Sequence, residues 1–463
     1  MKIKFKVWKI LVLLLVIILA AFIIPLPTGK RVQTPNFNDT SLKFPTGFFW
    51  GSSTSAHQVE GNSNDDLTQW EKDNAARLAA AAPAKFGNSV PDWNAIAAQA
   101  TSPQNYISGA ADDQYNLYPA DIKLMQQIGL NSYRFSIAWS RIEPQRGKFD
   151  QVAMQHYVTE IKALHAAGIE PFVTLWHRSE PSWVLAQGDW ENSQTITDYT
   201  QYVQYVAKNL NDEVTYWMTF NEPALEVLAG YIQGTLPPQV KSIQQGQMVM
   251  ANMIEAHKQA YQALHQINPE FQVGSTQAMQ LLSGAPGTLA NQLLASFLQD
   301  YMNWHFLDAT KDQTDFVGIQ YYGPSLIDLH FGGAGFVAVQ NPPNVKAAQR
   351  SDTGTEIYPA GIYQLLTQTY QRYKKPIIIT ENGIADSTDK LRAAYIADHL
   401  YWVKKALDSG IPVKGYFYWS LLDNFEWDSG FWPRFGLVQV DYANNLKRTI
   451  RPSALELKKI IGQ

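Results

Sequence analysis

The 463-residue sequence has no cysteine and few charged residues. Without cysteine, disulfide bonds, thiol nucleophiles and thiolate metal ligands are all excluded. Charged residues make up 17% of the chain, the net charge is −4, and no basic stripe follows the first ten residues. A nucleic-acid-binding surface needs clustered lysine and arginine, so no nucleic-acid partner is expected. The 46% share of hydrophobic residues is instead typical of a folded chain with a large core.

The first 31 residues differ in composition from the rest. Four lysines (Lys2, Lys4, Lys6 and Lys9) precede an unbroken apolar run from Ile10 to Ile24. A positive segment followed by an apolar one is the pattern of a secretory signal. No small-x-small cleavage site follows, so we expect residues 1–31 to form an uncleaved signal anchor, with a removed signal peptide as the alternative. The lysines predict a cytoplasmic N-terminus and a folded part on the non-cytoplasmic side.

Residues 32–43 read as a linker, and residues 44–463 read as one domain in which two kinds of segment alternate. Eight short apolar, β-branched or aromatic runs are candidate strands: 48–56, 131–139, 170–177, 214–222, 271–279, 315–323, 375–383 and 413–421. Segments with helical periodicity lie between them, for example at 118–129, 154–168 and 393–410. Buried strands alternating with helices indicate a parallel sheet, and eight such units predict a (β/α)₈ TIM barrel. The alanine-rich residues 78–100 are expected to be an insertion loop with a helical turn or two.

Two glutamates end predicted strands. Glu222 ends the fourth, in the stretch YWMTFNEP, and Glu381 ends the seventh, in ITENG. Chemistry in this barrel lies at the carboxyl ends of the strands, so both acids are expected to face one cavity. Glycoside hydrolysis needs such a pair, one carboxyl holding a proton and the other ionised. Like charges in one partly desolvated cavity push the two pKa values apart.

The chain resembles glycoside hydrolase family 1, the β-glucosidase family, from Phe44 to Ser453. The resemblance rests on FPTGFFWGSSTSAHQVEG, YRFSIAWSRIEP, TFNEP, ITENG, and WSLLDNFEW followed by RFGLVQVDY, in this order. It implies a (β/α)₈ barrel, a retaining mechanism, and neither a metal nor an organic cofactor. Glu222 matches the family's acid/base and Glu381 its nucleophile.

Other residues match family positions in the same motifs. Asn221 matches the residue that holds the sugar's 2-hydroxyl, and Arg134 and Tyr322 match the groups that contact the nucleophile. The positions that match substrate-binding residues are Gln58, His177, Gln320, Trp419, Glu426, Trp427 and Phe435. These assignments have structural alternatives. Asn221-Glu222-Pro223 could be a turn that caps a helix, His177 could be a core histidine, and Trp419 and Trp427 could be core packing. The mid-helix His257 is interpreted as structural.

The chain departs from the family pattern in three places. Arg178 follows His177 where the family has an aromatic residue, and it could stack on a sugar, pair with Glu180, bind an anionic substituent, or be solvated. Gln320 stands where the family has asparagine, which moves the amide by one methylene. Glu426 stands where the family's 6-phospho-glycosidases bind phosphate, so a phosphorylated sugar is not expected.

These patterns predict a retaining exo-β-glycosidase acting on a small β-glycoside or oligosaccharide, most simply a β-glucosidase or β-galactosidase. One alternative is a membrane-associated transglycosylase acting on a glycolipid, because the covalent intermediate can pass its sugar to water or to another hydroxyl. Another is an inactive sugar-binding relative, against which the two retained carboxylates argue.

Overall fold

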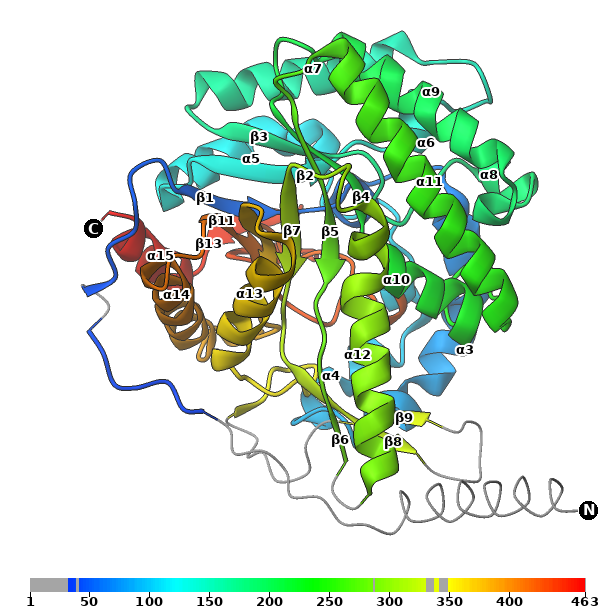
Figure 1. The fold of residues 1–463 in the computed structure, drawn as a ribbon. Helices are drawn as coiled ribbons and strands as arrows, with labels where there is room; N and C mark the ends of the chain where they lie inside the picture. The colour runs from blue at the N-terminus through cyan, green and yellow to red at the C-terminus, as the bar shows by residue number, and fades with distance from the viewer. Residues whose placement is uncertain (1–31, 39–40, 286–287, 330–336, 341–348, 463) are drawn as a thin grey trace, which may run out of the picture.

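The computed structural model describes residues 32–38, 41–285, 288–329, 337–340 and 349–462 (Figure 1). The predicted signal anchor, residues 1–31, lies outside the described residues. Within the described ranges, no helix is both long enough and apolar enough to cross a membrane.

Eight parallel strands close into a barrel in the order β1-β11-β10-β7-β5-β4-β3-β2. They are β1 (Phe49–Ser53), β2 (Ser132–Ser136), β3 (Glu170–Thr174), β4 (Tyr216–Asn221), β5 (Gln272–Ala278), β7 (Phe316–Gln320), β10 (Ile377–Asn382) and β11 (Val413–Trp419). Each predicted strand segment contains one of them, so the predicted (β/α)₈ barrel is confirmed. Every barrel strand is buried on both faces along most of its length, which explains the near-continuous apolar runs.

Helices surround the barrel (Figure 1). The longer ones are α5 (Gln114–Ile128), α7 (Gln151–Ala166), α9 (Gln194–Asn209), α11 (Ile243–Ile267), α12 (Leu289–Thr310), α13 (Ala360–Tyr373), α14 (Arg392–Asp408) and α15 (Pro452–Ile461). Short helices α2 (Ala56–Val59), α6 (Trp139–Ile142), α8 (Ser182–Ala186) and α10 (Pro223–Glu226) follow strands or lie in loops. The three helices expected from periodicity are present as α5, α7 and α14; α5 and α7 begin a few residues earlier than expected, and α14 begins one residue earlier.

The barrel interior is packed and is not an open channel. Phe172, Met218, Phe316, Ile378 and Phe417 form a buried cluster inside it. The rings of Phe172 and Phe417 meet at 4.7 Å in an edge-to-face arrangement. Because side chains fill the interior, a ligand can enter only from an end of the barrel.

The alanine-rich segment 78–100 is more ordered than expected. The prediction of a loop with a helical turn or two is wrong, because the segment supplies the end of α3 (Asp66–Phe86) and all of α4 (Trp93–Ala100). Alanine has the highest helix propensity, and Leu78 and Ala79 bury their side chains against Trp70 and Tyr106.

Two small sheets were not expected from the sequence. Strands β6 (Leu281–Gly284), β8 (Pro324–Leu329) and β9 (Val337–Gln340) form one, and β12 (Val438–Asp441) pairs with β13 (Lys447–Ile450) in the other. The first sheet continues β5 and β7 beyond the mouth of the barrel, at the lower side of Figure 1.

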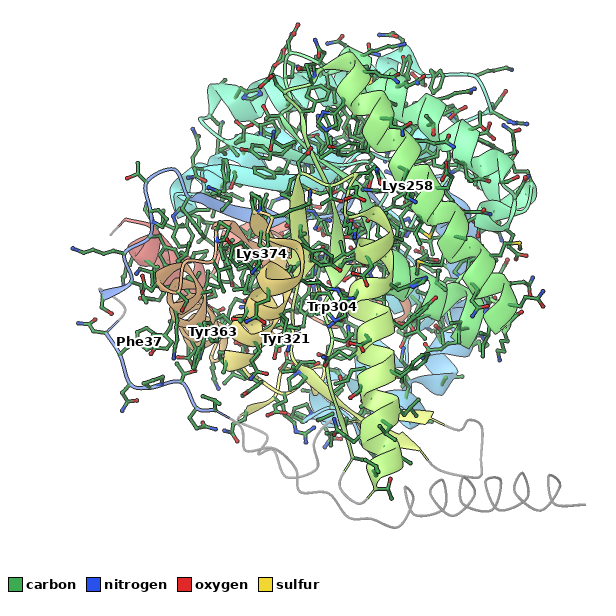
Figure 2. All side chains as sticks on the ribbon, in the orientation of Figure 1. Phe37, Lys258, Trp304, Tyr321, Tyr363 and Lys374 are labelled. Atoms are coloured by element: carbon green, nitrogen blue, oxygen red, sulfur yellow. The ribbon has the colours of Figure 1, made fainter. Side chains whose placement is uncertain are left out.

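The predicted linker is laid against the outside of the barrel. Phe37 stacks on Tyr401 of α14 with ring centroids 4.7 Å apart, and Figure 2 shows Phe37 on this flank. Thr34 Oγ1 accepts a hydrogen bond from the indole of Trp402 at 3.0 Å. The Val32 N–H donates to the Tyr358 hydroxyl at 3.3 Å. The segment thus runs along α14 toward the start of α13.

Candidate active site

A pocket of about 260 Å³ opens at the carboxyl ends of the barrel strands. It brings together Gln58, His177, Glu222, Tyr322, Glu381, Trp419, Glu426, Trp427 and Phe435 among its lining residues. Nine of the twelve residues expected at the site therefore line one cavity. The other three, Arg134, Asn221 and Gln320, lie directly behind its floor.

The Glu381 carboxylate is held by three side chains. Its Oε1 accepts hydrogen bonds from Arg134 Nη1 and from Gln320 Nε2, each at 2.6 Å. Its Oε2 accepts one from the Tyr322 hydroxyl at 2.6 Å. Burial raises the pKa of Glu381, while Arg134, Tyr322 and Gln320 act to lower it. Three donors, one of which is a cation, stabilise the ionised form and fix its orientation.

Asn221 ends β4 and lies between the arginine and the amide that hold Glu381. Its Oδ1 accepts hydrogen bonds from Arg134 Nη2 at 2.6 Å, Gln320 Nε2 at 2.8 Å and Thr276 Oγ1 at 3.0 Å. With Oδ1 occupied, the donor side of the amide is the part left for another ligand.

Gln320 occupies a different place from the one expected. It was predicted to bind substrate, but its side chain is fully buried and contacts Asn221, Thr276 and Glu381. The extra methylene, relative to asparagine, lets the amide reach from β7 to the Glu381 carboxylate on the neighbouring strand β10. Gln320 therefore belongs to the support behind the pocket.

Glu222 has quite different surroundings. It adopts a left-handed backbone conformation with φ 50° and ψ 49°, and Pro223 follows as the first residue of α10. Within the described residues, its carboxyl receives no side-chain hydrogen bond. Burial first, and then the negative charge of Glu381, raise the pKa of Glu222 to about 8, although Arg178 and Arg134 act to lower it. Glu222 is thus protonated at neutral pH while Glu381 is the better-stabilised anion.

A third acid lies in the same pocket. The Trp419 indole donates to Glu426 Oε1 at 3.1 Å, and burial raises the pKa of Glu426 to about 8. Gln58 lies nearby with Oε1 accepting from Ser55 at 2.6 Å and Nε2 donating to the Phe425 carbonyl at 2.7 Å. These groups can donate to or accept from hydroxyls on a bound ligand.

Aromatic rings form one wall of the pocket. The His177 ring lies 6.1 Å from Trp427 and 6.0 Å from Trp419, and burial lowers its pKa well below the usual value, so the imidazole is neutral. Its Nδ1 is buried without a hydrogen-bond partner.

His57 supports the same wall from behind and was missed by the sequence reasoning. It stacks on Trp427 at 5.8 Å with the rings 10° from parallel. Its ring nitrogens contact Asp65 at 2.7 Å and Glu71 at 2.6 Å. Burial acts to lower the pKa of His57, but the two carboxylates raise it well above the usual value. The wall residue Trp427 is therefore backed by an imidazolium.

Arg178 also contacts this wall. Its guanidinium lies 5.2 Å from the centroid of Trp427 and forms a 2.9 Å ion pair with Glu226 of α10. The expected alternative partner, Glu180, instead accepts from the Trp176 indole at 3.2 Å. Arg178 thus joins the loop after β3 to α10, the helix that directly follows Glu222.

One side of the pocket is lined by hydroxyl groups that the sequence reasoning missed. Ser351, Thr353 and Thr355 line it together with Ile357. The Ser351 N–H donates to the Thr355 carbonyl at 2.9 Å, which closes a turn, and the Ser351 and Thr353 hydroxyls lie 2.8 Å apart. This segment is a turn and carries no strand or helix periodicity, so its sequence offered no signal for these residues.

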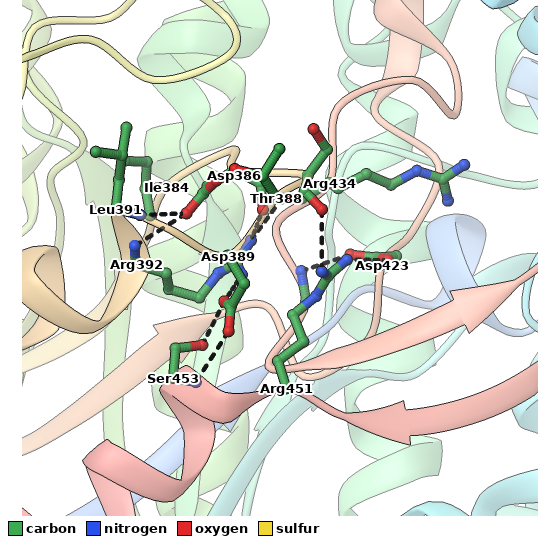
Figure 3. A network of polar contacts seen from close by, with 12 residues as sticks. Ile384, Asp386, Thr388, Asp389, Leu391, Arg392, Asp423, Arg434, Arg451 and Ser453 are labelled. Carbon is green, nitrogen blue, oxygen red and sulfur yellow. Dashed lines mark hydrogen bonds and ion pairs between the residues drawn. The ribbon is translucent and has the colours of Figure 1, made fainter. Parts of the chain in front are cut away.

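A polar network fastens the loop after β10 to the loop after β11, which carries Glu426 and Phe435 (Figure 3). The Asp386 N–H and Arg392 Nη2 both donate to the Arg434 carbonyl, at 2.9 Å each. Arg451 Nη2 donates to Asp423 at 2.8 Å. The bonds to the Arg434 carbonyl connect the two loops that flank Glu381 and Glu426, and the Arg451 bond joins the second loop to the start of α15. In the part of the chain that the structure describes, no group of three or more His, Asp or Glu residues is arranged to hold a metal ion.

Comparisons with known proteins cover nearly the whole barrel. The family model "Glycosyl hydrolase family 1" matches residues 40–310 and 303–463. Beta-glucosidase A of Acetivibrio thermocellus is 31% identical over 468 residues, which span 91% of this chain and 99% of that protein. The solved β-glycosidase from Pyrococcus horikoshii is 34% identical, with a TM-score of 0.78 over 91% of this chain and 95% of that one. A chloroplastic galactolipid galactosyltransferase of Arabidopsis thaliana is 31% identical, but the match spans 74% of this chain and only 56% of that protein.

Proposed function

The chain belongs to glycoside hydrolase family 1, and from that membership we propose that it is a retaining exo-β-glycosidase acting on β-glucosides or β-galactosides. Glu222 is the acid/base and Glu381 the nucleophile. The observation that carries these roles is the contrast between the two carboxyls. Glu381 accepts hydrogen bonds from three side chains, whereas Glu222 is buried beside that negative charge and has a pKa of about 8.

The first step breaks the glycosidic bond. A Glu381 oxygen attacks C1 of the sugar, the bond from C1 to the leaving oxygen breaks, and Glu222 gives its proton to that oxygen. The product is a glycosyl ester of Glu381 and a free aglycone. The donor side of the Asn221 amide is available to the sugar's 2-hydroxyl as positive charge develops at C1.

The second step hydrolyses the ester. Esterification removes the negative charge of Glu381, which is the second-largest cause of the raised pKa of Glu222. The pKa of Glu222 then falls, so its carboxylate can take a proton from water. The water oxygen attacks C1, the ester bond breaks, and the β configuration is restored.

We assign recognition of the sugar to the rest of the pocket. Gln58, His177 and Glu426 offer hydrogen-bonding atoms to its hydroxyls, and the Trp419 and Trp427 rings with Phe435 offer apolar faces. Tyr322 and Arg134 keep Glu381 ionised and aimed at C1.

A panel of nitrophenyl α- and β-glycosides tests the function. Hydrolysis of the β-glucoside or β-galactoside is expected, with the first product also in the β configuration when followed by NMR. Hydrolysis of α-glycosides alone, or a first product of inverted configuration, would rule the proposal out.

We also propose that residues 1–31 anchor the enzyme in a membrane with the barrel on the non-cytoplasmic side. The support is the sequence alone: four lysines before the apolar run Ile10–Ile24. Full-length protein is expected to float with vesicles and resist carbonate extraction, and release by carbonate would contradict the anchor.

Transglycosylation is not favoured as the reaction of this chain, because the match to the galactosyltransferase covers only about half of that protein.

A further inference from the structure

Large apolar side chains that remain exposed gather at one end of the barrel. Within the described residues they are Val32 and six residues in the first halves of α7, α11, α12 and α15, namely Val152, Ile243, Met248, Leu293, Phe297 and Leu455. Helices of a (β/α)₈ barrel start at the mouth, because each follows the carboxyl end of a strand. The helix α15 also starts there, since the Ser453 N–H donates to Asp389 in the loop after β10 at 2.9 Å. The exposed apolar residues therefore lie toward the mouth end of the barrel.

The start of α12 is the most apolar part of this end. Leu293 is 59% exposed and Phe297 is 66% exposed, and a spacing of four places them on one helix face. No charged residue occurs between Phe271 and Gln299. Figure 1 shows this end of α12 projecting past the mouth beside β6, β8 and β9.

The chain enters the described structure at the same end. Val32, which is 51% exposed, donates its N–H to the Tyr358 hydroxyl. Tyr358 directly follows Ile357, which lines the pocket. Residues 1–31 are therefore joined to the barrel on its mouth side.

The tether between the apolar run and the mouth is short. From Ile24 to Val32 there are eight residue steps, and at about 3.6 Å each they reach at most about 29 Å. If Ile10–Ile24 lies in a bilayer, the pocket mouth cannot move far from the bilayer surface.

We propose that Val32, Leu293 and Phe297, together called the apolar rim, dock onto the lipid bilayer that holds residues 10–24, so that the pocket opens toward the lipid surface. The proposal rests on the membrane anchoring proposed above. Leucine and phenylalanine on an uncharged helix face suit the boundary between headgroups and acyl chains. The substrate class that this orientation favours is a β-glycoside whose aglycone is a membrane lipid, because its sugar is presented directly to the mouth.

The absence of cysteine allows a test with single labels. In the full-length chain, Ser296→Cys places a spin label beside Phe297, and Ser409→Cys places one at the end of α14, on the opposite side of the barrel; both serines are exposed. The protein is reconstituted in phosphatidylcholine–phosphatidylglycerol vesicles, and relaxation by lipid-soluble oxygen is compared with relaxation by a water-soluble nickel chelate. The oxygen-to-nickel ratio is expected to rise severalfold at position 296 and to stay unchanged at 409.

A second measurement tests the substrate class. Phe297→Glu is expected to cut hydrolysis of a glucosyl lipid in the same vesicles severalfold and to leave hydrolysis of a soluble aryl glucoside unchanged. Ser409→Glu, with the same added charge at the opposite end, is expected to change neither rate.

The outcomes separate the proposals from one another. Vesicle-bound protein with a nickel-accessible label at 296 would overturn the docked rim and leave the anchor standing. If the label at 296 is shielded from the nickel chelate and its spectrum also shows spin–spin broadening, two labels lie close together. That result would overturn the docked rim, because the rim would then be covered by a second copy of the chain. Equal effects of Phe297→Glu on lipid-borne and soluble substrates would overturn the substrate class, and loss of aryl glucoside hydrolysis by the unsubstituted enzyme would contradict the catalytic proposal instead.

Discussion

Replacing Glu226 by glutamine should make Glu222 a stronger acid. The pKa of Glu222 is raised to about 8 by burial and by Glu381, is lowered by Arg178 and Arg134, and is raised in turn by Glu226. Glu226 now forms a 2.9 Å ion pair with Arg178. The Glu226→Gln variant loses a negative charge near Glu222 and leaves the guanidinium without its anionic partner, so both changes favour the ionised form of Glu222.

The size of the shift follows from these contacts. An opposite charge within about 4–6 Å lowers a carboxyl pKa by about 1–3 units. Arg178 already lowers the pKa of Glu222 while it is paired with Glu226. In Glu226→Gln that ion pair is lost and so is the negative charge of Glu226. We expect these two changes together to lower the pKa of Glu222 by about one unit. That shift corresponds to about 1.4 kcal/mol between the two protonation states.

The assay is the pH dependence of kcat/KM for a β-glucoside with a poor leaving group, because its alkaline limb reports the acid of the free enzyme. Activity falls as pH rises through the pKa of Glu222, so the limb should move about one unit toward acid in Glu226→Gln. Adding Arg178→Met to that variant should move it back.

The control is Glu213→Gln, which removes an acid paired with Lys162 at 3.5 Å on the far side of the barrel from the mouth. Its alkaline limb should match that of the unsubstituted enzyme. An unmoved limb in Glu226→Gln, or one that moves toward alkali, would refute the electrostatic role of the pair.

Three further predictions address the residues around C1. Glu381→Gly should abolish hydrolysis of an aryl β-glucoside, and azide should restore turnover by giving the α-glycosyl azide; full activity without azide would contradict its role as nucleophile. Glu222→Ala should slow substrates with poor leaving groups far more than activated aryl glycosides, and equal losses would exclude the acid role. Gln320→Asn should withdraw the amide from its 2.6 Å bond to Glu381 and reduce kcat/KM by about tenfold, in line with about 1.5 kcal/mol for a hydrogen bond to a charged group. An unchanged kcat/KM in a variant with an unchanged melting temperature would show that this bond has no catalytic effect.

The barrel and the floor of its pocket could be predicted from the sequence because both depend on local pattern. Each strand is a short apolar run, and Glu222 and Glu381 stand where such runs end. The insertions were harder to predict. Residues 78–100 contain proline and glycine and read as a loop, but their alanines complete helices because Trp70 and Tyr106 provide a surface to bury them. The sequence of residues 78–100 alone cannot show that other parts of the chain provide a surface for these alanines to pack against.

The same limit applies to side-chain partners, and Arg178 is the clearest case. From the sequence, Glu180 was a candidate partner because it is two residues away, yet the ion pair forms with Glu226, 48 positions along the chain (226 − 178). The choice depends on α10, whose first turn begins at the left-handed Glu222 and directs Glu226 back toward the loop after β3.

This pairing also explains how an arginine can stand where the family has an aromatic residue. The guanidinium lies over the Trp427 ring, 5.2 Å from its centroid, and that ring stacks on His57. An unpaired arginine at this position would lower the pKa of Glu222 and weaken its hold on the proton that it must deliver. Glu226 offsets that charge from α10, the helix that directly follows Glu222. The substitution is therefore compatible with acid catalysis near neutral pH because Arg178 and Glu226 act as a pair, and either residue alone would shift the pH at which the enzyme works.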